Sequence, residues 1–387
     1  MGGPRRSGAR GMAYYYIFYI YGKFRRKGEL IMKASVKFLS VLLIVAMCFS
    51  LAGCYDEDLN WSAKYDDTEL PAGAYIYYLS IAYNEAASKV STEDEVLKSE
   101  IDGTPAETWI KNRADEYVNQ YFYIQNEMKR LGLEMTDEDY STCLQTTESY
   151  WNYFGTSFEK FGIAKTSFDI AYSQYNRMYL KVFNALYGEG GENEVPESEL
   201  RQHIEDDYYD YEYFSAPLTK TDDDNKSVDL TDEEKADLKE TLEKYKTKIE
   251  SGAMTVNDAA TDYALKVQQD STYQTGIKDE NGMQSSYMPD AFISAIKEMN
   301  EGDVEVVEST KYMIVLHRLP IKEDEDTLLE SSDNRSQLLL ELKNTEYADA
   351  VSAAAQSFEG VEWNQKVLNR YKPAMFADTT KNGTSSV

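Results

Sequence analysis

Few residues in this sequence have the chemistry of a nucleophile, a general base or a metal ligand, since its 387 residues include two histidines and three cysteines. Cys143 lies in the acidic phrase DEDYSTCLQ with no histidine nearby, so we expect a small buried helix residue and no nucleophile. His203 is expected to face solvent on a polar helix, and His317 to be exposed at the end of a strand. No phosphate-binding glycine loop, zinc-ligand spacing or nucleophile elbow is present. We therefore expect no cofactor.

One stretch has the ligand spacing of a calcium loop. Val228 occupies the position where such a loop needs glycine, and a predicted strand precedes the stretch. A solvated loop, followed by a helix whose capping box is formed by Thr231 and Glu234, accounts for the same side chains. We therefore predict no metal site. The side chains with this spacing are Asp223, Asn225, Ser227, Asp229, Thr231 and Glu234.

Cys54 has a more specific context. A basic segment and an apolar run at 38–49 precede it, which together predict a secretory signal peptide over 32–53. The run is too short for a stable membrane span, which needs roughly 20 apolar residues. The phrase LAGC at 51–54 resembles the lipobox of bacterial lipoproteins, which implies that Cys54 receives a diacylglyceryl group and becomes the new N-terminus. An uncleaved anchor and a chance match are the alternatives. The expected location is the extracytoplasmic face of the cell membrane, with a lipid anchor.

Residues 1–31 precede this signal, and we interpret them as an upstream extension, with Met32 as the true start. After residue 53 the chain carries 31 basic and 67 acidic groups, a net charge near −36. Such a charge argues against nucleic acid or an anionic membrane surface as the partner. Only Cys54 and Cys143 remain, so no internal disulfide is available. The polar, acidic residues 54–70 are interpreted as the lipidated cysteine and a tether.

Helical periodicity dominates residues 71–210. From Glu107 onward, apolar residues recur every three or four positions, which predicts one buried stripe of a long helix that stops at Gly132. Thr136, followed by acidic residues, predicts the N-cap of the next helix. This region is expected to be a multi-helix domain.

The pattern changes over residues 211–320. A strand in YEYFSAPL, several helices and two closing strands, DVEVVES and KYMIVLHRL, predict a small sheet domain, with residues 270–287 as a loop. Residues 321–375 return to helix and are expected to pack on the first domain, and residues 376–387 are expected to be a disordered tail. The predicted fold class is therefore α+β, with a small sheet domain inserted into a helical one.

Several phrases carry a resemblance to a known family: KRLGLEMTDED, ENEVPESELRQHIEDDYYD, EKYKTKIESGAMTVNDAATDYA and MPDAFISAIKEMNEGDVEVVES. They are similar to phrases of the exported foldases of the SurA and PrsA type. In that family a parvulin-like prolyl isomerase domain is inserted into a helical chaperone domain. The resemblance covers roughly residues 73–358.

The resemblance implies a proline pocket in the sheet domain. The family lines this pocket with a methionine and a phenylalanine, and Met288 and Phe292 occupy those positions. Their spacing of four predicts one helix face, although ordinary core packing is the alternative. The two histidine positions of the family fall near Tyr213 and on Met313, so neither holds a histidine.

A further family position, acidic or thiol, aligns with Lys266, or with Asp270 if a gap is allowed. The resemblance implies a membrane-anchored foldase that binds unfolded exported polypeptides. The departures from the family pattern predict that its isomerase domain is weak or inactive. One alternative is an active isomerase that uses a rearranged pocket including Lys266. Another is a lipoprotein that binds peptides or glycans. The oligomeric state is not predicted.

Overall fold

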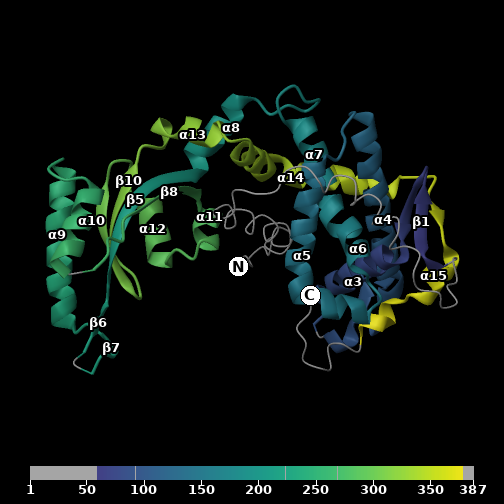
Figure 1. Ribbon diagram of the computed structural model, residues 1–387, viewed down its shortest axis with the longest axis horizontal. Coiled ribbons are helices and arrows are strands. Elements are labelled where there is room, and N and C mark those ends of the chain that lie inside the picture. The colour runs from purple at the N-terminus through teal and green to yellow at the C-terminus, as the bar shows by residue number, and fades with distance from the viewer. Residues whose placement is uncertain (1–58, 92, 223, 268, 378–387) are drawn as a thin grey trace, which may run out of the picture. The chain divides into compact units, whose positions relative to one another are not determined.

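The computed structural model describes residues 59–91, 93–222, 224–267 and 269–377. The predicted upstream extension, signal peptide and lipidated Cys54 lie outside these ranges. The described chain forms two compact units (Figure 1). The helical unit comprises residues 59–200 and 331–377, and the sheet unit comprises residues 201–330. Together they make an α+β protein, as predicted. No helix in the described ranges is both long enough and apolar enough to cross a bilayer.

The helical unit is built around two long helices. Helix α3 (Ala72–Ser88) buries ten of its 17 residues, so little of it faces water. Helix α4 (Ala106–Arg130) buries one stripe, and α14 packs on it. The other helical segments are η3 (Glu93–Lys98), α5 (Asp137–Lys160), α6 (Lys165–Phe168), η4 (Asp169–Gln174), α7 (Tyr175–Tyr187), α14 (Ser332–Gln356), α15 (Gln365–Arg370) and η6 (Pro373–Phe376).

Helix α5 begins as its sequence predicts. The Thr136 side chain accepts from the Asp139 backbone, and the Asp139 carboxylate accepts from the Thr136 N–H, which completes a capping box. Asp139 is buried and is paired with Arg177 and Lys181 of α7. The π-helical segment η4 also holds α5, because Cys143 donates its S–H to a carbonyl there, 3.5 Å away.

The expected tether over 54–70 is contradicted where the structure describes it. Strands β1 (Trp61–Tyr65) and β2 (Thr68–Pro71) form a hairpin. Ala63 lies opposite Leu70, and both are fully buried, so these apolar side chains hold the hairpin on the unit. Strand β11 (Glu362–Trp363) pairs with β1 to complete a three-stranded sheet. A two-stranded pair, β3 (Glu100–Ile101) and β4 (Thr104–Pro105), completes the unit.

The prediction that the disordered tail begins at residue 376 is also wrong. Phe376 is buried and contacts the rings of Tyr83 and Phe161 at centroid distances of 5.7 Å and 4.8 Å. The rest of the predicted tail, from residue 378, lies outside the described ranges.

An antiparallel four-stranded sheet in the order β8-β5-β10-β9 forms the second unit. Leu319 of β10 lies opposite Asp210 of β5, and Leu316 lies opposite Tyr213. The elements are α8 (Glu197–Asp207), which begins in the helical unit, then β5 (Tyr208–Pro217), β6 (Thr219–Thr221), β7 (Ser227–Asp229), α9 (Asp232–Glu250), α10 (Val256–Val267), β8 (Gln274–Asp279), α11 (Glu280–Ser285), α12 (Asp290–Glu298), β9 (Val304–Glu308), β10 (Tyr312–Leu319), η5 (Ile321–Glu323) and α13 (Glu325–Leu329).

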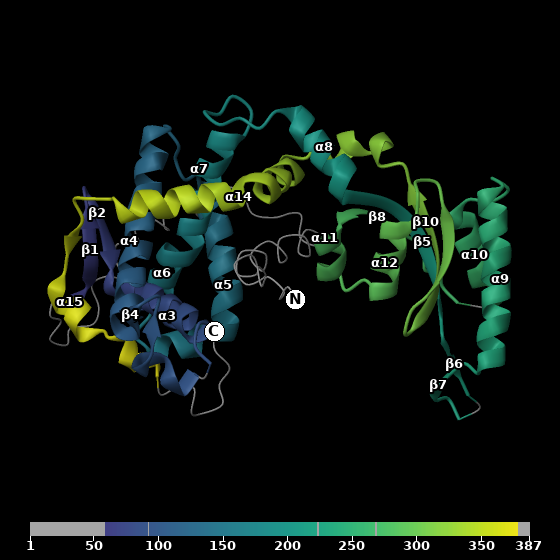
Figure 2. The ribbon, with the colours of Figure 1, turned by 180° about the vertical axis from the view of Figure 1, so that it is seen from behind.

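The predicted loop over 270–287 is wrong. Its middle is the edge strand β8, which pairs with β5, and its last part is the short helix α11 (Figure 2). Gly276 of β8 lies opposite Tyr211, and a Cβ at Gly276 would come within 2.8 Å of the Tyr211 hydroxyl. The glycine that makes this strand look like a loop in the sequence therefore makes room for a tyrosine ring.

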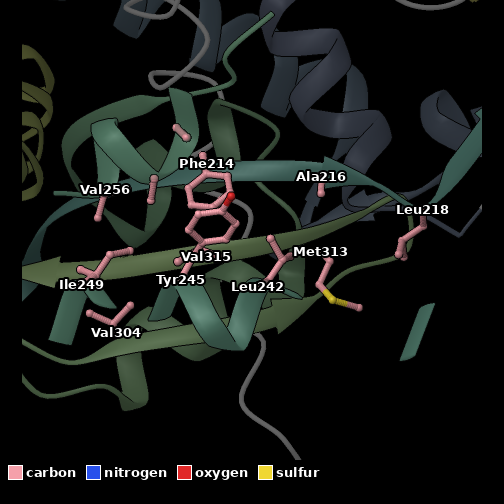
Figure 3. Close-up of a cluster of buried hydrophobic side chains, with 12 residues drawn as sticks. Phe214, Ala216, Leu218, Leu242, Tyr245, Ile249, Val256, Val304, Met313 and Val315 are labelled. Carbon is pink, nitrogen blue, oxygen red and sulfur yellow. The ribbon is translucent and has the colours of Figure 1, made fainter. Parts of the chain in front are cut away.

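Each face of the sheet has its own hydrophobic core. The face covered by α9 and α10, here the α9/α10 face, contains Phe214, Tyr245, Met313 and Val315 (Figure 3). The opposite face, here the α12 face, is covered by side chains of α12, including Phe292. Its buried residues are Tyr211, Met283, Phe292, Ile293, Ile296, Met299, Ile314 and Leu316.

Candidate functional site

Three aromatic rings meet on the α12 face. Tyr211 and Tyr213 alternate with Phe214 along β5, so their side chains point away from the α9/α10 core. Phe292 contacts both tyrosines edge-on, with centroid distances of 5.2 Å in each case. Phe292 is fully buried, whereas Tyr213 is only partly buried. Phe292 therefore forms the floor of this cluster, and Tyr213 lies at its rim.

Met288 joins the cluster from outside the helix. Helix α12 begins at Asp290, so the expectation that Met288 and Phe292 share one helix face is wrong. Tyr287, just before Met288, has a positive φ of 57° and an exposed side chain. Met288 packs on the cluster, and the Tyr213 hydroxyl donates to its Sδ at 3.9 Å. The structure therefore brings together three predicted pocket residues, Tyr213, Met288 and Phe292.

The tyrosines of the cluster are neutral hydrogen-bonding groups. Burial raises the pKa of both Tyr211 and Tyr213 above the usual tyrosine value. The Tyr211 hydroxyl has no hydrogen-bond partner among the described residues. Such a surface can bind an apolar ring by contact, with one phenol at its rim to donate a hydrogen bond.

Two basic residues belong to this face but have other contacts. Lys278 of β8 donates to the Ser286 hydroxyl, and burial lowers the pKa of Lys278. The Arg318 guanidinium donates to the Met299 carbonyl at 2.6 Å, which ties the end of α12 to β10. Both side chains therefore join elements within the unit.

Met313 is separated from the other pocket candidates. It pairs with Ala216 and is buried in the α9/α10 core, on the opposite side of the sheet from Phe292. Ile314 and Leu316 take the corresponding places on the α12 face. A displacement of one residue along a strand reverses the face of a side chain, which explains the difference from the sequence alignment.

Lys266 and Asp270 do not join the cluster. Lys266 of α10 donates to Asp262 at 2.7 Å and to the hydroxyl of Tyr245, a residue of the α9/α10 core, at 2.9 Å. Asp270 is exposed in the segment before β8. The rearranged pocket that would include Lys266 is therefore not assembled in this structure.

The prediction that His203 and His317 are exposed to solvent is wrong. His317 is mostly buried, and its Nδ1 lies 2.9 Å from Glu212 Oε1, while Tyr273 donates to Glu212 Oε2 at 2.8 Å. Burial would raise the pKa of Glu212, but the hydrogen bonds from His317 and Tyr273 outweigh it and lower that pKa. No local signal in the sequence predicts this trio, because its members lie in three separate segments.

His203 is mostly buried as well. Its Nδ1 forms a hydrogen bond with Asp207 Oδ2 at 2.8 Å, and its ring lies edge-on to Tyr208 at 5.9 Å. The spacing of four between His203 and Asp207 was the available signal for this pair.

Two sequence expectations agree with the structure. Cys143 is a buried helix residue, and burial, as the largest cause, raises the pKa of its thiol to about 12, so it is a poor nucleophile. The helix α9 begins with the predicted capping box of Thr231 and Glu234. These two residues therefore serve as a helix cap.

Comparisons with known proteins gave matches in structure alone. No family model matches the chain, and no curated protein sequence matches it. The fold is similar to the foldase protein PrsA from Streptococcus pneumoniae str. Canada MDR_19A, with 13% identity and a TM-score of 0.36, over 70% of this chain and 97% of that one. It is also similar to PrsA from Bacillus subtilis, with 14% identity and a TM-score of 0.29, over 72% of this chain and 93% of that one.

Proposed function

We propose that this protein is a lipid-anchored extracytoplasmic foldase that binds unfolded exported polypeptides and has weak or no prolyl isomerase activity. The proposal rests on the order of the two units along the chain. Residues 59–200 and 331–377 build one helical unit, and the sheet unit is inserted between them. This is the organisation that the foldase-like phrases in the sequence predict. The signal peptide and the lipobox-like phrase at 51–54 supply the setting.

Helix α5 is the candidate surface for clients on the helical unit. It packs against η4 and α6, and it exposes three large apolar side chains, Tyr140, Leu144 and Tyr153. Leu144 and Tyr140 are four residues apart and share one side of the helix. Tyrosine and leucine at an exposed helix surface offer contact area that places few geometric demands on a client.

The α12 face is the candidate second site, for proline-containing segments. Tyr213, Met288 and Phe292 form an apolar cluster there, and the histidine pair of the family is absent from it. An isomerase must favour the twisted amide over the planar one, across a barrier of roughly 18–20 kcal/mol. A cluster with only neutral phenols supports binding of a proline ring more than catalysis of its rotation.

The proposed binding of unfolded polypeptides is tested by following the aggregation of an unfolded protein in the presence of purified residues 55–387. We expect suppression of aggregation, reduced severalfold by Leu144→Asp because a buried client contact would then meet a charge. Leu265→Asp, at a leucine of α10 that is more exposed than Leu144, is the control and should leave suppression unchanged. No effect of the parent protein on aggregation or refolding would exclude the chaperone function.

The proposal of weak or no isomerase activity is tested by measuring the rate of cis/trans exchange of an X-Pro peptide. We expect little or no acceleration by the parent protein, together with chemical-shift changes in the ring of Tyr213 on peptide addition. Met288→Ala should remove those changes while the fold is retained, because Met288 is only partly buried. Robust acceleration that is lost in Phe292→Ala would instead establish an active isomerase.

A further inference from the structure

Lys278 is a lysine without a carboxylate partner in a strongly acidic chain. It lies on β8 opposite Tyr209, which packs on the cluster of the α12 face, so the Lys278 side chain projects from that face. No Asp or Glu oxygen in the described ranges forms an ion pair with its ammonium, whose one hydrogen-bond partner there is Ser286. Acidic groups outnumber basic ones by 67 to 31 after residue 53, so an unpaired ammonium is unusual in this chain.

The two carboxylates that follow Lys278 in the sequence have other partners. The Asp279 side chain accepts from the Gly282 N–H at 2.8 Å and caps α11. Glu280 Oε2 accepts from Lys297 of α12 at 2.5 Å. Burial lowers the pKa of Lys278, and the charge of Asp279 offsets this effect only in part. Lys278 is therefore a partly buried cation without a counterion.

Ser286 holds the ammonium in place and leaves part of it unused. Lys278 Nζ donates to Ser286 Oγ, and the Ser286 hydroxyl in turn donates to the Gly282 carbonyl at 2.7 Å. An ammonium has three donors. Since Ser286 accepts from one of them and no other acceptor lies among the described residues, two donors are left for a ligand.

The ammonium borders the rim at which we propose that proline-containing segments bind. Ser286 lies two residues before Met288, so their Cα atoms are at most about 7 Å apart. The turn between them is closed on α11, which lies beside β8 (Figures 1 and 2), because the Met288 N–H donates to the Met283 carbonyl at 3.1 Å. Met283 is itself buried in the cluster. A group carried within a few residues of a bound proline therefore reaches Lys278.

We infer that Lys278 binds a carboxylate of the client, so that the α12 face prefers proline-containing segments with an acidic group close to the proline. This inference rests on the proposed function, because it names the class of segment that the same site binds. Ser286 is a positioning residue, which aims the ammonium. The carboxylate belongs either to an aspartate or glutamate side chain or to the C-terminus of the client. It is favoured over a neutral acceptor because charge-assisted hydrogen bonds are roughly twice as strong as neutral ones.

The test compares proline peptides that differ only in the acidic group. Calorimetry at physiological salt measures their binding to purified residues 55–387. One peptide has glutamate beside the proline and blocked ends, a second has glutamine in its place, and a third is the glutamine peptide with a free C-terminal carboxylate after the proline. We expect at least one carboxylate peptide to bind about fivefold more tightly than the blocked glutamine peptide. Comparison of the first and third peptides identifies the source of the carboxylate.

Three variants separate a specific contact from the general charge of the chain. Lys278→Met keeps most of the apolar side chain and should abolish the preference, with the affinity for the glutamine peptide unchanged. Ser286→Ala should reduce the preference to about twofold, because the ammonium is then less well aimed. Lys239→Met makes the same change in net charge at an exposed lysine of α9 and should leave the preference intact. Chemical-shift changes in the ring of Tyr213 with the glutamine peptide show that each variant keeps the site folded.

Failure of this inference is distinguishable from failure of the proposed function. Equal affinity of the three peptides for the parent protein would overturn the inference and leave the proposed proline site in place. A preference that survives in Lys278→Met, or that is lost equally in Lys239→Met, would also overturn it. Absence of binding by any of the peptides would exclude the proposed proline site, and the inference with it.

Discussion

The two faces of the four-stranded sheet are built differently. On the α9/α10 face, two helices cover the core, and polar side chains form closed groups beside it: Tyr245 with Asp262 and Lys266, and Glu212 with His317 and Tyr273. On the α12 face, α12 and the short helix α11 cover an aromatic cluster whose rim, Tyr213 and Met288, is partly exposed. The α9/α10 face therefore mainly stabilises the unit, whereas the partly exposed rim of the α12 face is where we propose that proline-containing segments bind.

The largest expected effect comes from the α9/α10 core. Phe214→Ala removes a fully buried ring that contacts Tyr245 and Tyr263, and should lower the free energy of unfolding by about 3–5 kcal/mol. Met288→Ala, at the exposed rim of the other face, should cost about 1 kcal/mol. Hydrogen exchange of the β5 and β10 amides measures both changes within the whole protein. Equal losses in the two variants would remove the distinction between the faces.

The fit of Tyr211 on the α12 face can be tested at Gly276. Gly276→Ala places a methyl group against the Tyr211 ring and hydroxyl and should destabilise the unit by about 1–3 kcal/mol. Tyr211→Phe alone should be nearly neutral, because its buried hydroxyl has no partner in the described structure. The double variant should recover part of the loss, and hydrogen exchange of β8 reports it. Full additivity would contradict the close contact.

The Glu212 group of the α9/α10 face predicts a pH dependence. The pKa of Glu212 is lowered by folding, so its stabilising contribution is complete above the ordinary glutamate value of 4.5 and is lost as the pH falls through the lowered value. Glu212→Gln should remove about 1–2 kcal/mol near neutral pH and flatten the loss of stability below pH 4.5. Denaturant unfolding as a function of pH measures this, with Glu308→Gln on the exposed part of β9 as the control. An unchanged acid profile in Glu212→Gln would show that other carboxylates dominate.

The smallest expected change in stability comes from Tyr213 at the rim of the cluster, and this variant tests which part of the side chain contacts a peptide. Tyr213→Phe removes only a weak hydrogen bond to sulfur and should change stability by less than about 0.5 kcal/mol. Peptide binding measured by calorimetry should be retained if the ring supplies contact area. Loss of binding in Tyr213→Phe would instead show that the hydroxyl donates to the peptide.

Local signals in the sequence predict the helices well. Thr136 and Thr231 are N-caps whose partners lie three residues later, and both capping boxes form as predicted. These features depend on neighbouring residues alone, so tertiary structure does not override them. The aromatic residues of β5 and the apolar run Met313–Leu316 of β10 likewise predict two strands of the sheet.

The errors concern elements that depend on distant partners. Strand β8 has little apolar alternation and contains Gly276. The glycine is explained only by its partner on β5, because the Tyr211 side chain leaves no room for a Cβ there. The hairpin of β1 and β2 is acidic at its turn, and Ala63 and Leu70 are its two fully buried apolar side chains. Such segments read as loops because their pairing is tertiary.

The candidate site was predictable in part. Tyr213, Met288 and Phe292 meet, although Met288 reaches the cluster from the turn before α12. Met313 could not be assigned to a face without the strand register, since one residue of displacement reverses the face. Glu212 and Tyr273 were missed because their contacts with each other and with His317 join three separate parts of the chain.

The pairing of Asp210 with Leu319 has an evolutionary consequence. The chain passes into the sheet through β5 and out through its hydrogen-bonded neighbour β10, so the two ends of the inserted segment lie side by side. A segment with adjacent ends behaves as a cassette that can be lost, exchanged or allowed to decay while the host chain needs only a short turn to close. Relatives in which this cassette is deleted, or carries a restored pair of histidines, would be accommodated by the same host.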